Sequence, residues 1–225
     1  MGWVLADKFN EFIIKYNIVG FFDEPLKLKS GRKSYWYVNW RNVAQDVYLM
    51  DQLTNYLLSF VSYLNLNLTC FYGVPEGATK LGIITQLKWA KLQENFLPYN
   101  YILPMGRGKP KEHGDPKDKY FLGMPSGNVV ILEDTTTTGE SLIDCIKSLN
   151  KIDVNVIAAI VLTDRNEFRD DKRTVEEVIA DLGIKYYAMS NATEILPKLN
   201  PNNHIAQKIE EYFKIYGTKP IFFKQ

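Results

Sequence analysis

The sequence predicts an α/β fold in which a mainly parallel β-sheet is flanked by helices. From one segment to the next, apolar residues alternate between helical spacing and short continuous runs. Those runs are apolar on both faces, which is typical of parallel strands covered by helices on both sides. No internal repeat, low-complexity tract or Ser/Gly-rich linker interrupts the sequence, so we expect residues 1–225 to form a single domain.

The first half of the chain supplies a helix, a strand and a second helix in turn. Apolar residues three or four apart predict a long helix over residues 42–64. Residues 68–73 form a short apolar run that predicts a buried strand, and 101–104 predict another. The three glycines in GVPEGATKLG predict a loop whose backbone passes close to a ligand or another segment, followed by a helix to about Glu94.

The second half continues the alternation after a long loop. Residues 106–128 are rich in Gly, Pro, Lys and Asp and have little to bury, which is typical of a functional lid or a disordered segment. Residues 205–216 predict a final helix, and the apolar tail IFFKQ after it either docks on the core or contacts a partner. The other expected elements are strands over 128–134, 154–162 and 184–189 and helices after 139 and over 174–182.

Charge and cysteine content exclude several classes of protein. The 27 Lys and Arg nearly balance the 26 Asp and Glu, so the net charge of +1 argues against a general binder of nucleic acid or of anionic membranes. No apolar run approaches the ~18 residues needed to span a bilayer, and the first residues do not form a signal peptide. Cys70 and Cys145 lie in apolar stretches without paired spacing. We therefore expect a cytoplasmic protein with free thiols.

The most informative segment is VVILEDTTTTGESL, residues 129–142. A buried strand brings Glu133 and Asp134 to the carboxyl edge of the sheet, where ligands bind in such folds. Threonines and a glycine follow where a helix begins, and the N–H groups of a helix N-terminus suit a phosphate. The acids would repel a phosphate, so they suit hydroxyls or a shared cation; a phosphorylated sugar satisfies both halves. The alternative is a solvated strand end with a helix cap from Thr138 and Ser141.

This segment resembles the PRPP-binding signature of type I phosphoribosyltransferases, where PRPP is 5-phospho-α-D-ribosyl 1-diphosphate. Four further segments, in the same order, are similar to orotate phosphoribosyltransferases. They are the substrate loop LKLKSGRKSYWYVN (26–39), the pyrophosphate-side loop FYGVPEGATKLG (71–82), the mobile loop GRGKPKEHG (106–114) and the orotate-contacting strand VLTDR (161–165). The resemblance implies a type I phosphoribosyltransferase core over 41–200, a small N-terminal hood and substrate-loop portion over 1–40, and a C-terminal helix and tail over 201–225.

The resemblance also implies a role for each matching residue. Glu133 and Asp134 would hold the ribose hydroxyls of PRPP, and Asp134 would also count among the catalytic residues with Arg107, Lys111 and His113. Those three lie on the mobile loop 106–123, which would reach the neighbouring subunit of a homodimer. The 5-phosphate would be bound by Thr137, Thr138, Gly139, Glu140 and Ser141, the pyrophosphate region by Lys29, and orotate by Lys29, Tyr37, Val38, Thr137 and, through its carboxylate, Arg165.

The implied reaction is the transfer of the 5-phosphoribosyl group from PRPP to orotate. It yields orotidine 5′-monophosphate and pyrophosphate, in pyrimidine (UMP) biosynthesis. The implied cofactor is Mg²⁺, held mainly by PRPP, with no strong protein ligand. A closing cationic loop and Mg²⁺ would stabilise the departing pyrophosphate more in the transition state than in the ground state.

Two departures from the family pattern keep other functions open. Glu76 stands where many members place a lysine, and Gly108 stands where a second basic residue often follows the loop arginine. One alternative is a paralogous phosphoribosyltransferase for another base, against which Arg165 argues because neutral purines have no carboxylate. The other is a regulator that binds PRPP or a nucleotide without turnover.

The basic residues also have plainer explanations. Lys29, Arg32 and Lys33 are equally compatible with a solvated basic turn, and the cations of loop 106–123 with a flexible linker. Arg165 and Asp164 are compatible with an exposed ion pair, worth at most roughly 1 kcal/mol.

Overall fold

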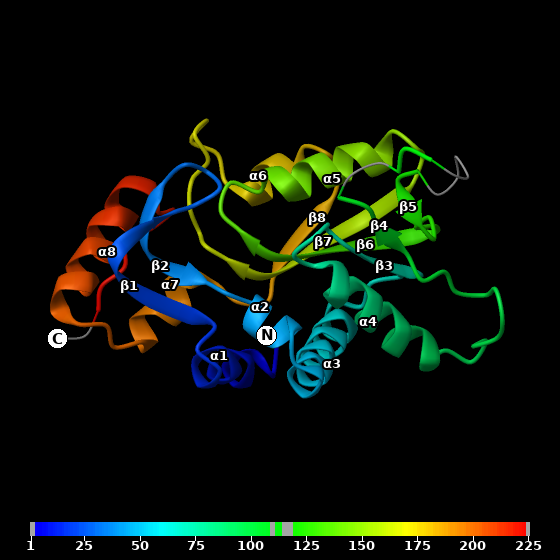
Figure 1. Cartoon of the computed structure of the whole chain (residues 1–225), viewed down its shortest axis with the longest axis horizontal. Coiled ribbons are helices and arrows are strands. Elements are labelled where there is room, and N and C mark those ends of the chain that lie inside the picture. Colours follow the sequence, from blue (N-terminus) through cyan, green and yellow to red (C-terminus); the bar gives the residue numbers. More distant parts are fainter. Residues whose placement is uncertain (1–2, 109–110, 114–118, 224–225) are drawn as a thin grey trace.

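A computed structural model describes residues 3–108, 111–113 and 119–223. Its centre is a four-stranded parallel sheet in the order β3-β6-β7-β8, which confirms the predicted α/β class (Figure 1). The strands are β3 (Cys70–Gly73), β6 (Asn128–Thr136), β7 (Asn155–Asp164) and β8 (Lys185–Ala188). Within the described residues, no helix is long and apolar enough to cross a membrane.

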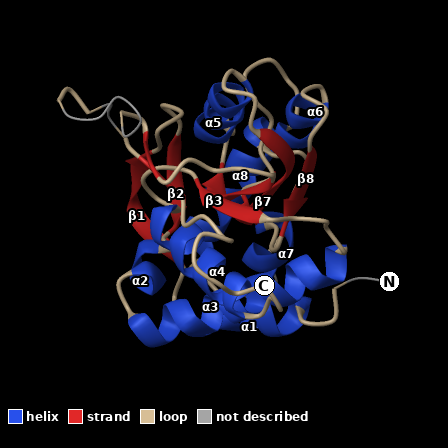
Figure 2. Cartoon of the chain, turned by 90° about the vertical axis from the view of Figure 1, so that its right-hand side faces the viewer, coloured by secondary structure: helices blue, strands red, loops and turns tan. Residues whose placement is uncertain are grey.

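Helices cover both faces of this sheet (Figure 2). One face carries α5 (Glu140–Asn150) and α6 (Val175–Ala180), and the other carries α1 (Ala6–Lys15), α3 (Val47–Leu64) and α4 (Thr79–Lys91). Along β6, Val129 and Ile131 pack into the apolar cluster that includes residues of α5 and α6. Val130 and Leu132 pack into the cluster on the other face, which includes residues of α1 and α3. Because side chains alternate along a strand, a strand apolar on both faces contributes to two cores at once.

A separate antiparallel hairpin lies within residues 1–40, where a hood was predicted, and we call this hairpin the hood. It pairs β1 (Val19–Lys27) with β2 (Lys33–Val38), and α8 (Asn203–Tyr216) packs against it. Trp36 of β2 is fully buried and stacks on Phe213 of α8, with 5.9 Å between ring centroids. The C-terminal helix therefore fastens the hood to the rest of the chain.

The remaining elements are short. They are α2 (Arg41–Ala44), α7 (Ala192–Ile195) and the 3₁₀-helix η2 (Leu196–Lys198). After α8 the tail docks on the core: Ile221 is buried, and the N–H of Phe223 donates to Glu210 Oε1 at 2.9 Å.

Two sequence predictions about these elements are wrong. The helix expected over 42–64 is two helices, α2 and α3, because Asp46 is extended and its carboxylate caps α3 by accepting from the Leu49 N–H at 2.8 Å. The strand expected over 101–104 does not form. Instead, the Ile102 carbonyl accepts a hydrogen bond from the Gln86 side chain at 2.9 Å, and strand pairing starts only at β4 (Met105–Gly106).

The segment 106–128 is also more regular than expected. β4 pairs with β5 (Phe121–Leu122) as an antiparallel hairpin. The Arg107 N–H then bonds the Tyr120 carbonyl at 3.0 Å, and the Lys111 N–H bonds the Lys119 carbonyl at 2.8 Å. Residues 109–110 and 114–118 of the predicted mobile loop lie outside the described residues.

Candidate functional site

A cavity of about 310 Å³ opens at the carboxyl end of β6. Its walls come from the loop between β1 and β2, the end of β2, the turn after β3 and the loop between β6 and α5. All the residues predicted to bind PRPP or orotate line it: Lys29, Tyr37, Val38, Glu133, Asp134, Thr137, Thr138, Gly139, Glu140, Ser141 and Arg165. The structure thus brings together side chains that lie more than a hundred residues apart.

Two acids form the floor of the cavity at the end of β6. Burial raises the pKa of Glu133 well above its ordinary value, the adjacent Asp134 raises it further, and Lys29 opposes the shift. The Asp134 carboxylate accepts from the Thr135 N–H at 2.7 Å. A Cβ on Gly77 would lie 3.1 Å from Asp134 Oδ2, so the backbone of the turn after β3 lies against this carboxylate. The pair is therefore held between two loops, where it can accept hydrogen bonds from ligand hydroxyls.

The loop from β6 to α5 is shaped to receive an anion. Gly139 caps α5 with φ +69°, and a Cβ there would lie 2.7 Å from Val175 Cγ1, so only glycine fits without rearrangement. No side chain caps α5, which leaves the first N–H groups of the helix for a ligand. The side chain of Arg169 donates to the Thr138 carbonyl, and Lys29 Nζ donates to Ser141 Oγ at 2.7 Å. The loop is thereby fastened from both sides.

Two hydroxyls in this cavity have unmet hydrogen-bonding capacity. Ser30 Oγ and Thr135 Oγ1 are buried, line the cavity, and have no hydrogen-bond partner among the described residues. Buried polar atoms are almost always paired in folded proteins. Both residues therefore add polar groups to the lining of the cavity.

On the hood side, Arg165 is buried rather than paired with Asp164 as an exposed ion pair. It is 2% exposed, its Nε donates to Glu167 Oε1 at 2.7 Å, and its guanidinium lies 3.7 Å from the Trp36 ring centroid. Asp164 instead accepts from the Tyr186 hydroxyl at 2.8 Å. The alternative of a solvated basic turn is also wrong for Arg32, which is buried.

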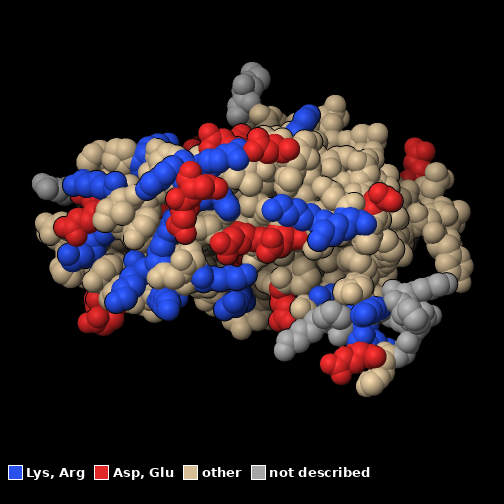
Figure 3. Space-filling model, turned by 90° about the horizontal axis from the view of Figure 1, so that it is seen from above, with Lys and Arg blue, Asp and Glu red and all other residues tan. Residues whose placement is uncertain are grey.

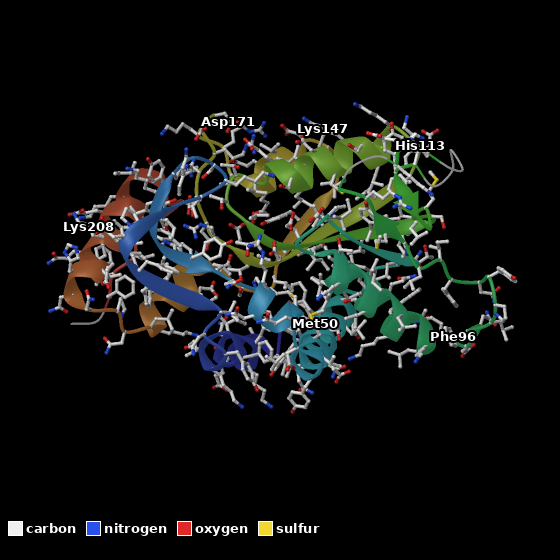
Figure 4. The ribbon with its side chains drawn as sticks, viewed as in Figure 1. Met50, Phe96, His113, Lys147, Asp171 and Lys208 are labelled. Atoms are coloured by element: carbon white, nitrogen blue, oxygen red, sulfur yellow. The ribbon has the colours of Figure 1, made fainter. Side chains whose placement is uncertain are left out.

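The loop residues Arg107, Lys111 and His113 do not line the cavity. His113 lies on the right of Figure 4, whereas the hood strands that form one cavity wall lie on the left of Figure 1. The hairpin does begin beside the cavity, because a Cβ on Gly108 would lie 2.6 Å from Glu76 Oε1. Within one chain, the structure does not bring the predicted loop cations to the predicted substrate residues.

Sequence reasoning missed Arg41, which also lines the cavity. It is the first residue of α2, and two contacts fix that helix: Trp40 Nε1 donates to Thr163 Oγ1 at 3.1 Å, and Lys80 Nζ donates to the Ala44 carbonyl at 3.0 Å. Its position two residues after the substrate-loop segment 26–39 is the signal that could have found it.

Charge on the outer surface is mixed. Figure 3 shows Lys and Arg interspersed with Asp and Glu on the face it displays. This agrees with the net charge of +1.

Several known phosphoribosyltransferases are similar to this chain. No protein-family model matches the chain. An orotate phosphoribosyltransferase of Bradyrhizobium diazoefficiens is 30% identical over 176 residues, which are 75% of this chain and 86% of the relative. The crystal structure of the Francisella tularensis orotate phosphoribosyltransferase matches at a TM-score of 0.69 with 21% identity, covering 94% of this chain and all (100%) of the other.

A third match is the Mycobacterium tuberculosis orotate phosphoribosyltransferase in complex with PRPP. It has a TM-score of 0.58 and 16% identity, and covers 84% of this chain and 98% of the other. The structural likenesses establish the phosphoribosyltransferase fold. The 30% identity to the Bradyrhizobium diazoefficiens relative establishes the family. The chain belongs to the orotate phosphoribosyltransferase family.

Proposed function

We propose that this protein transfers the 5-phosphoribosyl group of PRPP to orotate, releasing pyrophosphate and forming orotidine 5′-monophosphate for UMP synthesis. One observation carries the proposal: a single cavity holds an acid pair, an uncapped helix N-terminus and a buried arginine. These groups match the ribose hydroxyls, the 5-phosphate and the orotate carboxylate respectively. Membership of the family and the PRPP complex of the Mycobacterium tuberculosis relative support the same assignment.

The protein would act by orientation and electrostatics. The orotate ring nitrogen loses its proton to solvent and attacks C1 of the ribose while the bond from C1 to the pyrophosphate oxygen breaks, so no protein nucleophile is needed. The carboxylates of Glu133 and Asp134 would hold the ribose by its hydroxyls, and the N-terminus of α5 would hold the 5-phosphate. Fixing both ends of PRPP sets the position of C1 relative to the base.

The cavity fits a Mg²⁺ ion that arrives with PRPP. Within the described residues, no group of three or more His, Cys, Asp or Glu side chains is placed to hold a metal. Mg²⁺ is commonly bound by one or two carboxylates together with substrate phosphates. Four carboxylates line the cavity, those of Glu76, Glu133, Asp134 and Glu140. Of these, Asp134 and Glu76 would meet such an ion, which would offset the charge of the departing pyrophosphate.

A homodimer would bring the missing cations to the site. Arg107, Lys111 and His113 do not line the cavity of their own chain, which supports their service to a neighbouring one. Exposed apolar side chains are also concentrated in the segment after α4, where Leu92, Leu97 and Tyr99 are well exposed and Phe96 lies at the lower right of Figure 4. Such exposure is typical of a protein–protein contact. The predicted cytoplasmic location stays a prediction.

The test is the fall in orotate absorbance when the protein meets orotate, PRPP and Mg²⁺. We expect turnover that requires all three, and a loss of at least about 10-fold in Asp134→Asn, because hydrogen bonds to a charged group contribute roughly 1.5–3 kcal/mol. Asp144→Asn makes the same change on the exposed side of α5, outside the cavity, and should be silent. PRPP binding without turnover would support a regulator, and turnover with another base would support a paralogue.

A further inference from the structure

Behind the cavity, Glu167 bridges two buried arginines. Its Oε1 accepts from Arg165 Nε at 2.7 Å, and its Oε2 accepts from Arg32 Nη1 at 2.9 Å and from the Tyr212 hydroxyl at 2.8 Å. The Glu167 side chain is fully buried. Arg165 lines the cavity, whereas Glu167 is not among its lining residues. The carboxylate therefore holds Arg165 from the side opposite the ligand.

The geometry also settles which part of Arg165 faces the ligand. Glu167 engages Nε, Ser34 Oγ accepts from Nη2 at 3.1 Å, and Trp36 covers one face of the guanidinium. A guanidinium has further terminal N–H groups beyond these two donors. Because Nε and one N–H of Nη2 are engaged and Trp36 covers one face, only the other N–H groups of Nη1 and Nη2 are left for a ligand carboxylate.

The balance of charge in this buried cluster also favours an anionic ligand group beside Arg165. The buried cluster holds two arginines and one glutamate, and the second carboxylate on Arg32 comes from Asp170, which is exposed to solvent. Arg165 has no second carboxylate among the described contacts. A buried positive charge is stabilised by a partner of opposite sign. An anionic group on the ligand would complete the pairing on the cavity side.

We infer that Glu167 is a positioning residue that aims Arg165 at the carboxylate of the base, so that discrimination between orotate and a base without a carboxylate depends on it. This inference rests on the proposed function. It extends that function to a network joining the hood, the strand β7 and the helix α8, through Arg32, Arg165 and Tyr212. A site built to pair a charged group rejects an analogue that lacks the group, because its own polar atoms are then left unpaired.

The experiment compares Glu167→Gln with Asp170→Ala in steady-state kinetics. Glutamine keeps the shape but places an amide donor against arginine and tyrosine donors, so it cannot bridge both arginines. We expect KM for orotate to rise about 10- to 100-fold, with KM for PRPP within about 2-fold of wild type. Activity with uracil should be unaffected, so the preference for orotate shrinks. Asp170→Ala removes only the exposed partner of Arg32 and should change neither constant.

Glu167→Asp guards against failure of the glutamine variant to fold. It keeps the charge one methylene away, and it should restore part of the preference for orotate. Equal rises in KM for PRPP and for orotate, or an unchanged orotate preference in a folded variant, would overturn the inference while leaving the proposed function intact. A wild-type protein that neither turns over nor binds orotate would overturn both.

Discussion

The cavity and the β4–β5 hairpin are built on opposite principles. Several walls of the cavity are fastened to another element: Lys29 donates to Ser141, Arg169 to the Thr138 carbonyl, and Arg165 to Ser34 of β2. Among its described residues, the hairpin has a two-residue pairing continued by two backbone bonds, and its Lys111 and His113 are exposed.

This difference suits the cavity to binding the substrates and the hairpin to stabilising the transition state. A preorganised wall holds substrate without rearranging when it arrives. A lightly held cationic hairpin can close over the departing pyrophosphate and exclude water while the bond breaks. Since the hairpin's cations do not line their own chain's cavity, the comparison also predicts that the two regions of one working site come from two chains.

The largest expected effect is recovery of activity in mixed dimers. Lys111→Ala disables the hairpin and Asp134→Asn disables the cavity, so each variant alone should be nearly inactive. In a hybrid dimer one site carries both defects and the other carries neither. Random pairing makes about half of the dimers hybrids, so co-expression should restore about a quarter of wild-type activity.

The matched control combines Asp134→Asn with Glu133→Gln. Both changes lie in the cavity, so every site of the hybrid keeps one defect and no activity should return. Lack of recovery with Lys111→Ala as well would show that the hairpin serves its own chain.

The same contrast explains what the sequence could predict. Glu133 to Ser141 form one continuous run in which strand, acids and helix start are adjacent, so the phosphate and ribose groups were predicted together. Arg32, Glu167 and Tyr212 meet only after folding, and a pattern within any one segment contains no sign of that contact. Sequence reasoning therefore identified Arg165 but not the carboxylate that holds it.

The errors in secondary structure have the same origin. The apolar run 101–104 has the composition of a strand, but the Gln86 side chain satisfies the Ile102 carbonyl, so no neighbouring strand is needed there. The helix expected over 42–64 is interrupted where the Asp46 side chain competes for a backbone N–H. Side-chain hydrogen bonds of this kind override periodicity.

A smaller effect is expected at Arg41, the first residue of α2, which lines the cavity. It lines the cavity together with Pro75, Glu76 and Gly77 of the pyrophosphate-side loop, so it can supply a positive charge that these three residues lack. Arg41→Ala should raise KM for PRPP by about 10-fold, the loss of one charge-assisted contact. Lys33→Ala, an exposed change outside the cavity, should not. A rise in KM for orotate alone would place Arg41 on the base side instead.

The smallest effect concerns the stability of the cavity wall itself. Burial and Asp134 raise the pKa of Glu133, so the folded chain binds a proton there that the unfolded chain has already released. Wild-type stability should therefore fall as pH rises from the ordinary glutamate pKa through the raised one. Glu133→Gln removes that loss, so its melting temperature should exceed that of wild type more at pH 8 than at pH 5.

A change of about 1 kcal/mol in the free energy of unfolding moves the melting temperature of a chain of this length by roughly 2–4 °C. Thermal unfolding of both proteins without ligand, measured at each pH, gives the comparison. Glu140→Gln removes an exposed carboxylate at the first residue of α5 and makes the same change in net charge as Glu133→Gln, so it serves as the control. A difference between wild type and Glu133→Gln that is the same at both pH values would mean that the acid pair is not held at a cost to folding. The cavity would then carry no cost to folding at its acid pair, and it would differ from the hairpin only in how its residues are held by contacts to other elements.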